Sequence, residues 1–123
     1  MVNKYLINFS NHPSCNWSEK QKEEALKYGE IIDIPFPEVD AKGDENYINN
    51  LTISCLDKIH SICDMGIVTI HLMGELTLTF SLLKRLQEMG IRCIASTSRR
   101  IVKEYPNGRK EVTFQFERFR EYK

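Results

Sequence analysis

The sequence predicts an α/β fold in which a mainly parallel β-sheet is flanked by helices and followed by a C-terminal β-hairpin. Short apolar, strand-like runs alternate with helical patterns over residues 5–95. Parallel strands need crossover connections, usually helices, so this alternation favours a parallel sheet with helices on both sides. The dipeptide Asn107-Gly108 then separates two further strand-like runs, and it is typical of a two-residue hairpin turn.

The first half of the chain supplies two strands and two helices. Residues 5–9 form a short apolar run that predicts the first strand. The capping-box pattern Ser18-Glu19-Lys20-Gln21 predicts that a helix begins there, and residues 30–34 predict the second strand. A longer helix follows, because apolar residues recur at intervals of three and four: Ile48, Leu51, Cys55, Ile59 and Ile62.

The second half continues the alternation. Residues 67–72 are β-branched and almost wholly apolar, the pattern of a central strand covered on both faces. Residues 75–89 predict a helix that Gly90 ends, although residues 76–80 taken alone would also fit a strand. Residues 91–95 predict the fourth strand, and we expect the polar segment 96–100 to form a loop after it.

The predicted hairpin has an apolar face. A two-residue turn at Asn107-Gly108 would place Ile101 opposite Phe114 and Lys103 opposite Val112. One face would then collect Ile101, Tyr105, Val112, Phe114 and Phe116. The alternation slips beyond Phe116, since Phe119 falls on the opposite face, so we expect a bulge or a strand end near Glu117.

The length of 123 residues predicts a single domain over residues 1–123. The formal net charge is zero, but it is unevenly distributed. Residues 1–98 carry 9 Lys and Arg against 13 Asp and Glu, a net charge of −4, whereas residues 99–123 carry 8 against 4, a net charge of +4. Proteins that coat long duplex nucleic acid are usually basic overall, so we do not expect such a partner. A compact anion at a local basic surface is compatible with these charges.

Neither a membrane segment nor a resident cofactor is expected. The apolar runs are too short to span a bilayer and the N-terminus lacks a signal-peptide pattern, so we expect a cytoplasmic protein with no membrane partner. The four cysteines form no CxxC pair, so we expect reduced, mostly buried thiols and no metal. The GxGxxG and Walker A motifs are absent, which argues against nicotinamide, flavin and common ATPase chemistry.

Polar loops are expected at the carboxyl ends of the parallel strands, where ligands of open α/β sheets bind. Serine and threonine hydroxyls donate to phosphate oxygens, arginine matches them with a bidentate fork, and a glycine before a helix admits close approach. The alternative for residues 96–100 is a polar turn that leads into an exposed edge strand. The candidate ligand-binding residues are Ser10, Asn11, Met73, Gly74, Ser96, Thr97, Ser98, Arg99 and Arg100.

Three residues are candidates for catalysis. His12 could shuttle a proton near neutral pH, although an ordinary loop histidine explains it equally well. Glu75 could orient a ribose hydroxyl or act as a base, but an acidic residue at a helix start also interacts favourably with the helix dipole. Arg99 could stabilise charge that develops on a phosphate. We interpret His71 as a hydrogen-bonded core histidine and His60 as a surface residue.

Four short segments resemble a known family over nearly the whole chain. They are Asn8-Phe9-Ser10-Asn11-His12-Pro13, His71-Leu72-Met73-Gly74-Glu75, Ala95-Ser96-Thr97-Ser98-Arg99 and Phe116-Glu117-Arg118-Phe119-Arg120. The chain resembles the small stand-alone CRISPR-associated proteins of type III systems, which are related to ring nucleases with CARF-like, Rossmann-like folds. The resemblance implies a homodimer that binds a cyclic oligoadenylate second messenger across its two-fold axis, and ring cleavage without metal.

These inferences predict a cyclic oligoadenylate-binding protein, with cyclic tetra-adenylate as the expected ligand, that linearises the messenger and switches off antiviral signalling. The resemblance places no nucleophile on a particular residue. Two alternatives stay open: a module that sequesters or senses the messenger without cleaving it, and a small interaction subunit whose basic hairpin docks on a partner.

Overall fold

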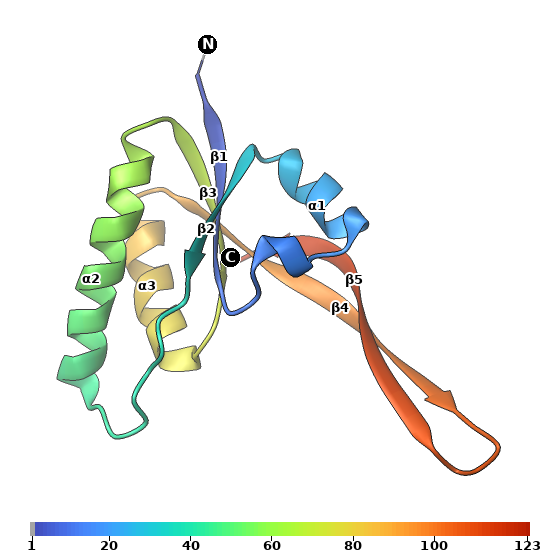
Figure 1. Ribbon diagram of the computed structural model, residues 1–123. Helices are drawn as coiled ribbons and strands as arrows, with labels where there is room; N and C mark the ends of the chain where they lie inside the picture. The colour runs from blue at the N-terminus through green and yellow to red at the C-terminus, as the bar shows by residue number, and fades with distance from the viewer. Residues whose placement is uncertain (1) are drawn as a thin grey trace.

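The computed structural model describes residues 2–123 and confirms the predicted α/β class (Figure 1). A mixed five-stranded sheet is flanked by helices. The elements in chain order are β1 (Lys4–Ser10), the short 3₁₀ helix η1 (Ser14–Asn16), α1 (Glu19–Leu26), β2 (Glu30–Pro35), α2 (Glu45–Cys63), β3 (Ile67–Met73), α3 (Leu76–Glu88), β4 (Arg92–Glu104) and β5 (Lys110–Glu121).

The strand order of the sheet is β2-β1-β3-β4-β5. The first three neighbouring pairs are parallel, and β4 and β5 pair in the antiparallel direction. The chain runs from β1 to β2 on one side and then crosses to β3 on the other, so the order reverses between β1 and β3. Such a switch point opens a crevice at the carboxyl ends of the strands.

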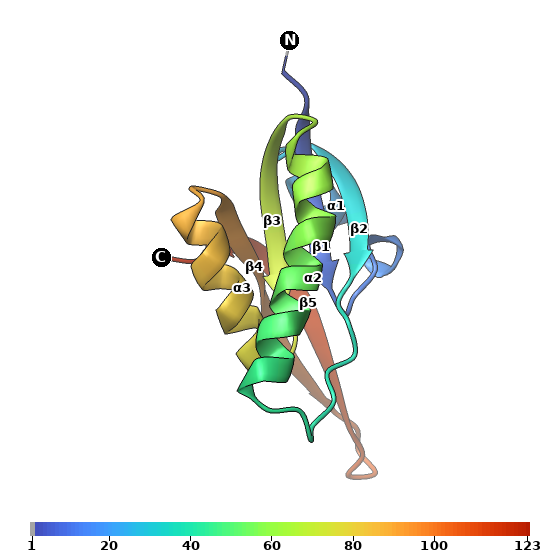
Figure 2. The same ribbon diagram turned by 90° about the vertical axis from the view of Figure 1, so that its left-hand side faces the viewer.

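Helices cover both faces of the sheet. α2 and α3 lie side by side on one face, and α1 lies on the other (Figures 1 and 2). The α2 and α3 face holds the larger apolar core, in which Leu78, Leu82 and Leu86 of α3 are fully buried. The smaller core on the α1 face contains Leu6, Trp17, Ala25, Ile94, Phe116 and Phe119. Within residues 2–123, no helix is both long and apolar enough to cross a membrane.

β4 and β5 extend beyond the rest of the sheet as a two-stranded arm (Figure 1). The expectation of a loop at residues 96–100 is wrong, because β4 runs unbroken from Arg92 to Glu104. The segment stays in a strand because β5 pairs with its backbone at every position from Thr97 to Glu104. A polar composition is compatible with a ribbon that is exposed on both faces.

The hairpin turn has three residues, so the predicted pairing is wrong by one position. The Tyr105 amide donates to the Arg109 carbonyl at 2.8 Å, and Gly108 has a φ of +84°. Pro106 favours the first central position of a type I turn, which leaves Gly108 alone to adopt the left-handed conformation. Ile101 therefore pairs with Thr113, and Val102 pairs with Val112. A one-residue change in register reverses the face on which a side chain lies, so Ile101 and Val112 lie on different faces of the hairpin.

The bulge predicted near Glu117 is confirmed. Thr97 pairs with Arg118 and Ser98 pairs with Phe116, which leaves Glu117 as the extra residue of β5. The bulge returns Phe119 to the same face as Phe116, and their ring centroids are 4.9 Å apart. Both rings can therefore pack in the core under α1.

The structure keeps all four cysteines as free thiols. Cys55 and Cys93 are buried, whereas Cys15 is exposed and Cys63 is half-buried. The prediction of mostly buried thiols therefore holds for Cys55 and Cys93 and is wrong for Cys15. Burial raises the pKa of the Cys93 thiol to about 12, which keeps this side chain protonated and unreactive.

Candidate functional site

A row of polar side chains crosses the sheet on its α1 face. Asp33 of β2, Asn8 of β1 and His71 of β3 occupy the same register position on adjacent strands. The next strand places Ile94 beside His71, and Ser96 follows two residues later on the same face of β4. The parallel pairing thus brings together four residues that are far apart in the sequence, and we call them the polar row.

Hydrogen bonds fix the direction of each proton in the polar row. The Asn8 amide Nδ2 donates to Asp33 Oδ1 at 2.7 Å and to the His12 carbonyl at 2.9 Å. Both partners only accept hydrogen bonds, which assigns the Asn8 oxygen to the contact with His71 Nδ1 at 2.9 Å. His71 Nδ1 therefore carries the proton of a neutral ring. Its Nε2 is free to accept from the Ser96 hydroxyl, which lies 2.6 Å away.

The imidazole of His71 is held in an apolar surrounding. It is 2% exposed, and the rings of Trp17 and Phe119 approach it edge-on with centroid distances of 5.3 and 5.6 Å. Burial, with charge repulsion from the nearby His12 as the smaller cause, lowers the pKa of His71 from 6.5 to about 4. His71 is consequently neutral at neutral pH. The interpretation of His71 as a hydrogen-bonded core histidine agrees with this geometry.

Asp33 anchors the other end of the polar row. Its oxygens accept from the Ser14 amide at 3.1 Å, from the Ser14 hydroxyl at 2.7 Å and from Asn8. Desolvation raises the pKa of this carboxyl, but the three hydrogen bonds outweigh it, so the pKa lies below its usual value. Asp33 is therefore ionised at neutral pH and keeps accepting from Asn8.

A pocket of about 310 Å³ opens over His71 and Ser96 at the carboxyl ends of the strands. It combines aromatic rings, two histidines and several hydroxyl or amide side chains. The residues that line it are His12, Asn16, Trp17, Gln21, His71, Met73, Ser96, Thr97, Ser98, Phe114 and Phe116. Five of the candidates from the sequence, His12, Met73, Ser96, Thr97 and Ser98, are brought together here.

Ser10 and Asn11 lie next to this pocket. Ser10 is buried, and its hydroxyl donates to Asn8 Oδ1 at 2.7 Å, which helps to fix the orientation of the Asn8 amide. Asn11 lines a smaller neighbouring cavity together with Asn8 and Asp33. Ser10 thus supports the site indirectly, through the orientation of Asn8.

Glu75 is engaged as the N-cap of α3. Its carboxylate accepts from the amides of Leu78 at 2.8 Å and Thr77 at 3.1 Å, and from the Thr77 hydroxyl. The backbone hydrogen bond from Leu78 is the largest cause of a lowered pKa for this carboxyl. The helix-terminus interpretation of Glu75 accounts for all of these contacts.

Gly74 accommodates an aromatic ring. A Cβ atom added at this position would clash with the ring of Phe36, and Gly74 has no positive φ. Phe36 in turn packs edge-on against Phe9, with ring centroids 5.4 Å apart. The space over Gly74 that the sequence analysis assigned to a ligand is therefore filled by the core.

The two arginines point to opposite faces of the arm. Arg99 lies 3.4 Å from the Glu117 carboxylate and 3.3 Å from the Gln115 side-chain oxygen. Arg100 pairs across the ribbon with Phe114 and therefore shares its face. Within residues 2–123, Arg100 takes part in no ion pair. Both lie inside β4, and the expectation that they follow a strand end is wrong.

Sequence reasoning missed Asn8, Trp17, Gln21 and Asp33 as parts of this site. Asn8 and His71 carried a usable signal, because each is a polar residue inside an apolar strand and buried polar groups need partners. Gln21, which donates to Ser96 Oγ at 3.0 Å, carried no such signal. In the part of the chain that the structure describes, no three His, Cys, Asp or Glu side chains are grouped so as to hold a metal ion.

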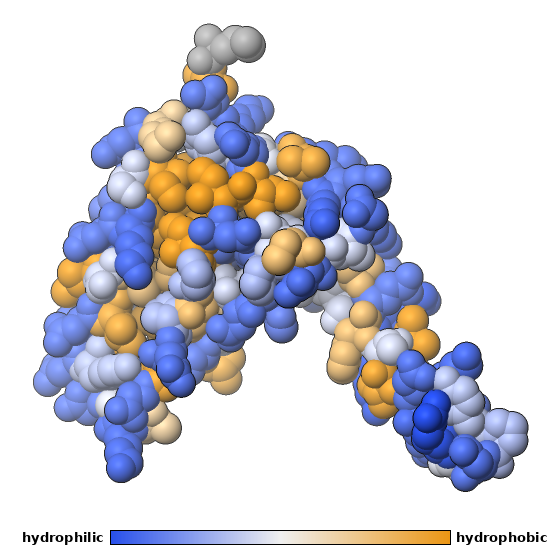
Figure 3. All heavy atoms as spheres, viewed as in Figure 1, coloured by the Kyte–Doolittle hydropathy of each residue, from blue (hydrophilic) through white to orange (hydrophobic). Residues whose placement is uncertain are grey.

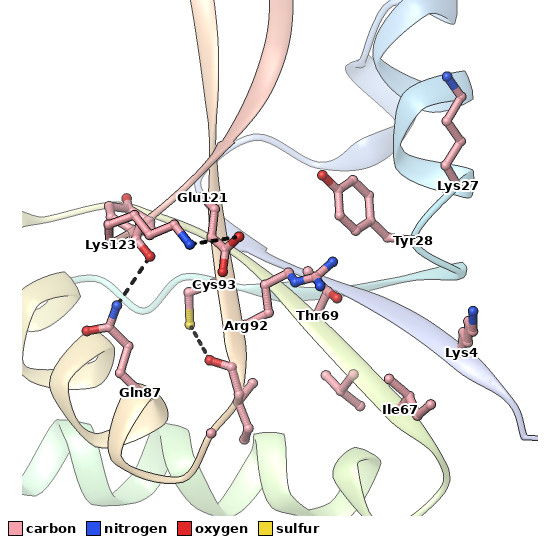
Figure 4. Close-up of a pocket in the computed structure, with 14 residues that line it drawn as sticks. Lys4, Lys27, Tyr28, Ile67, Thr69, Gln87, Arg92, Cys93, Glu121 and Lys123 are labelled. Carbon is pink, nitrogen blue, oxygen red and sulfur yellow. Dashed lines mark hydrogen bonds and ion pairs between the residues drawn. The ribbon is translucent and has the colours of Figure 1, made fainter.

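A second pocket, of about 660 Å³, lies at the amino ends of β1, β3 and β4 (Figure 4). Lys4, Lys27 and Arg92 surround it, and Lys123 lies 3.8 Å from Glu121. It is larger, but it lies at the sheet edge opposite the carboxyl ends and contains no buried polar row. The chemistry therefore favours the smaller pocket as the candidate site.

One family model matches residues 4–120, and its description is Uncharacterized protein MJ1673 family. The chain belongs to this family. The MJ1673 family match covers the polar row, the pocket over Ser96, all of β4, and β5 up to Arg120. No curated protein and no solved structure matches the chain.

Proposed function

We propose that this member of the MJ1673 family binds a cyclic oligoadenylate second messenger in the pocket over His71 and Ser96. The observation that carries the proposal is the combination of aromatic rings with hydrogen-bonding side chains at the switch point of the sheet. Phe114 is 69% exposed and offers a face for adenine, and such stacking contributes about 1–3 kcal/mol per base. The resemblance to type III CRISPR-associated proteins favours cyclic tetra-adenylate.

Arg100 is the proposed phosphate contact. It shares a face of the arm with Phe114, so a stacked nucleotide would place its phosphate near a free guanidinium. Ser98 lines the same pocket and supplies a hydroxyl donor, whereas the Thr97 hydroxyl donates to the Arg118 carbonyl at 2.9 Å. Arg99 lies on the opposite face beside Glu117, which makes it the matched comparison.

Ring cleavage is the proposed reaction. A ribose 2′-hydroxyl attacks the adjacent phosphorus, the O2′–P bond forms, the P–O5′ bond breaks, and a 2′,3′-cyclic phosphate results. The nucleophile belongs to the substrate, so the protein supplies positioning, which can lower a barrier by about 7–11 kcal/mol. Destruction of the messenger would switch off type III CRISPR antiviral signalling.

A homodimer is part of this proposal. Val102, Val112 and Phe114 lie on one face of the arm and are all exposed. Figure 3 shows hydrophobic residues on the part of the arm next to the body and hydrophilic ones towards its tip. A two-fold axis beside the arms would bury this face and present two pockets to a symmetric ring. Light scattering that finds only a 14.4 kDa species, with and without ligand, would refute the dimer.

The deciding experiment measures binding and cleavage of labelled cyclic tetra-adenylate by the wild type and two variants. Arg100→Ala should weaken binding by about 1.5–3 kcal/mol, the value of a charge-assisted hydrogen bond. Arg99→Ala should bind nearly as the wild type does. Unchanged affinity in the Arg99→Ala, Arg100→Ala double variant, with the fold intact, contradicts the assignment of the phosphate contact.

Sequestration without cleavage is the second candidate. It is favoured because Glu75 is fully engaged in capping α3 and Arg99 is held by Glu117, which leaves neither beside the pocket. Mass spectrometry of the nucleotide after incubation with EDTA separates the two candidates. Linear product with a 2′,3′-cyclic phosphate supports cleavage, and intact bound ring supports sequestration.

A further inference from the structure

The Ser96 hydroxyl stands between a buried base and an open pocket. His71 is 2% exposed, and the rings of Trp17 and Phe119 lie against it. Ser96 is half-buried and lines the pocket. Ser96, whose oxygen lies 2.6 Å from His71 Nε2, therefore provides a route for proton exchange between a molecule in the pocket and His71.

The far end of the polar row determines which way the Ser96 proton points. Ionised Asp33 accepts from Asn8, and Asn8 accepts from His71 Nδ1. Neutral His71 then accepts the Ser96 proton at Nε2. Gln21 Nε2 donates to Ser96 Oγ at 3.0 Å, so one lone pair of this oxygen is left for the pocket.

This arrangement matches the geometry of an activated nucleophile. A hydroxyl is hydrogen-bonded to one nitrogen of an imidazole, and a third side chain orients the other nitrogen. Asparagine is the orienting group here, as in cysteine proteases that use a Cys-His-Asn set. The polar row thus gives Ser96 a hydrogen-bond acceptor whose other nitrogen is held by Asn8, which Asp33 holds in turn.

We propose that Ser96 is a catalytic residue: a reactive serine whose proton His71 accepts. For its substrate, the inference rests on the proposed function. In ring cleavage, the ribose 2′-hydroxyl gives its proton to Ser96 Oγ while Ser96 passes its own proton to His71 Nε2. The O2′–P bond forms and the P–O5′ bond breaks. The departing 5′ oxygen takes a proton from water, and the hydroxide that this leaves removes the proton from His71 through Ser96. Asn8 and Asp33 are positioning residues, since they act through His71.

Covalent labelling tests the reactivity of Ser96 without any nucleotide. Diisopropyl fluorophosphate should form one adduct, in which the Oγ–P bond forms and the P–F bond breaks with loss of fluoride. Peptide mapping should place the adduct on Ser96 and leave Ser98 unlabelled, because Ser98 lines the same pocket but lies in no such row. Ser96→Ala should abolish the adduct, and His71→Gln should slow labelling by at least about tenfold, since the base is lost.

Single-turnover cleavage of cyclic tetra-adenylate tests the role of Ser96 in the reaction. Ser96→Ala should lower the rate by about 10²–10⁴-fold, the usual contribution of acid–base catalysis, and should still bind the ring. Ser54→Ala, which removes an exposed hydroxyl from α2, is the matched control and should keep the wild-type rate. Thermal unfolding of each variant confirms that the fold persists.

The two proposals fail differently. No adduct on Ser96, together with wild-type cleavage by Ser96→Ala, overturns this inference and leaves ring cleavage standing. An adduct on Ser96 in a protein that cleaves no cyclic oligoadenylate refutes the proposed ring cleavage, and Ser96 is then a reactive serine toward another ester.

Discussion

Acidification should destabilise the fold through His71 before it acts through the carboxylates. The pKa of His71 is lowered from 6.5 to about 4 by burial, with His12 as the smaller cause. Between these two values the unfolded chain binds a proton that the folded chain does not. The free energy of unfolding therefore falls as the pH drops from 6.5 to 4, and this histidine contributes no further change below that.

The magnitude follows from the width of that window. About 2.5 pH units at about 1.4 kcal/mol each give a loss of about 3.5 kcal/mol. His71 is 2% exposed, so solvent screening does not reduce this value greatly. A small domain has a free energy of unfolding of about 5–15 kcal/mol, so the loss is a large fraction of the total.

Urea unfolding between pH 7 and pH 4 measures this dependence. The wild type should lose about 3.5 kcal/mol of unfolding free energy across the window through His71. His71→Gln, which has no titrating ring at this position, should lose that much less. His60→Gln removes an exposed imidazole and is the matched control. Asp33 affects stability at lower pH than His71 does. Its pKa in the folded protein lies below 3.8, so its contribution to the free energy of unfolding is lost only as the pH falls through that lower value. Equal slopes for the wild type and His71→Gln would refute the reasoning.

Three further changes test the packing that positions the site, each by urea unfolding at neutral pH. Leu82→Ala should cost about 2–5 kcal/mol because Leu82 is fully buried, whereas Leu76→Ala, at a position that is 83% exposed, should cost far less; similar losses would contradict the assigned core. Gly74→Ala should lower the free energy of unfolding by about 1–3 kcal/mol because the added Cβ clashes with Phe36, and combining it with Phe36→Leu should relieve part of that loss. If the losses of the two single variants simply add in the double variant, the contact is refuted. Glu75→Ala should cost about 0.5–2 kcal/mol through the lost cap of α3, with Glu88→Ala at the other end of the helix as its control; no difference between the two would exclude the cap.

The alternation of strands and helices could be predicted because each element carries its own local pattern. The capping box at Ser18 is realised, since the Ser18 hydroxyl accepts from the Gln21 amide at 3.2 Å. The apolar stripe of α2 and the β-branched run of β3 likewise follow from side-chain periodicity alone. In each case the residues that define the element lie within a few positions of one another.

The arm could not be predicted in the same way. Whether residues 96–100 form a loop or a strand depends on the pairing offered by β5, which lies about twenty residues further along. The pairing in turn depends on the turn, where Pro106 outweighs the preference of Asn107-Gly108 for two central residues. A single position of error there moved Ile101 to the wrong face.

The polar row shows why the candidate site was predicted only in part. Sequence reasoning looked for chemistry in the loops and found His12 and the hydroxyls of the pocket, but it treated His71 as core. His71 is core, and that burial is what gives Ser96 its partner, because a buried imidazole must place both of its nitrogens in hydrogen bonds. Which partners it finds is set by the strand order β2-β1-β3-β4, and this order aligns Asp33, Asn8 and His71 although 63 residues separate Asn8 from His71. A polar residue in the middle of an apolar strand is therefore evidence for a polar row across the sheet. The residue at the exposed end of that row is the one to test for catalytic reactivity.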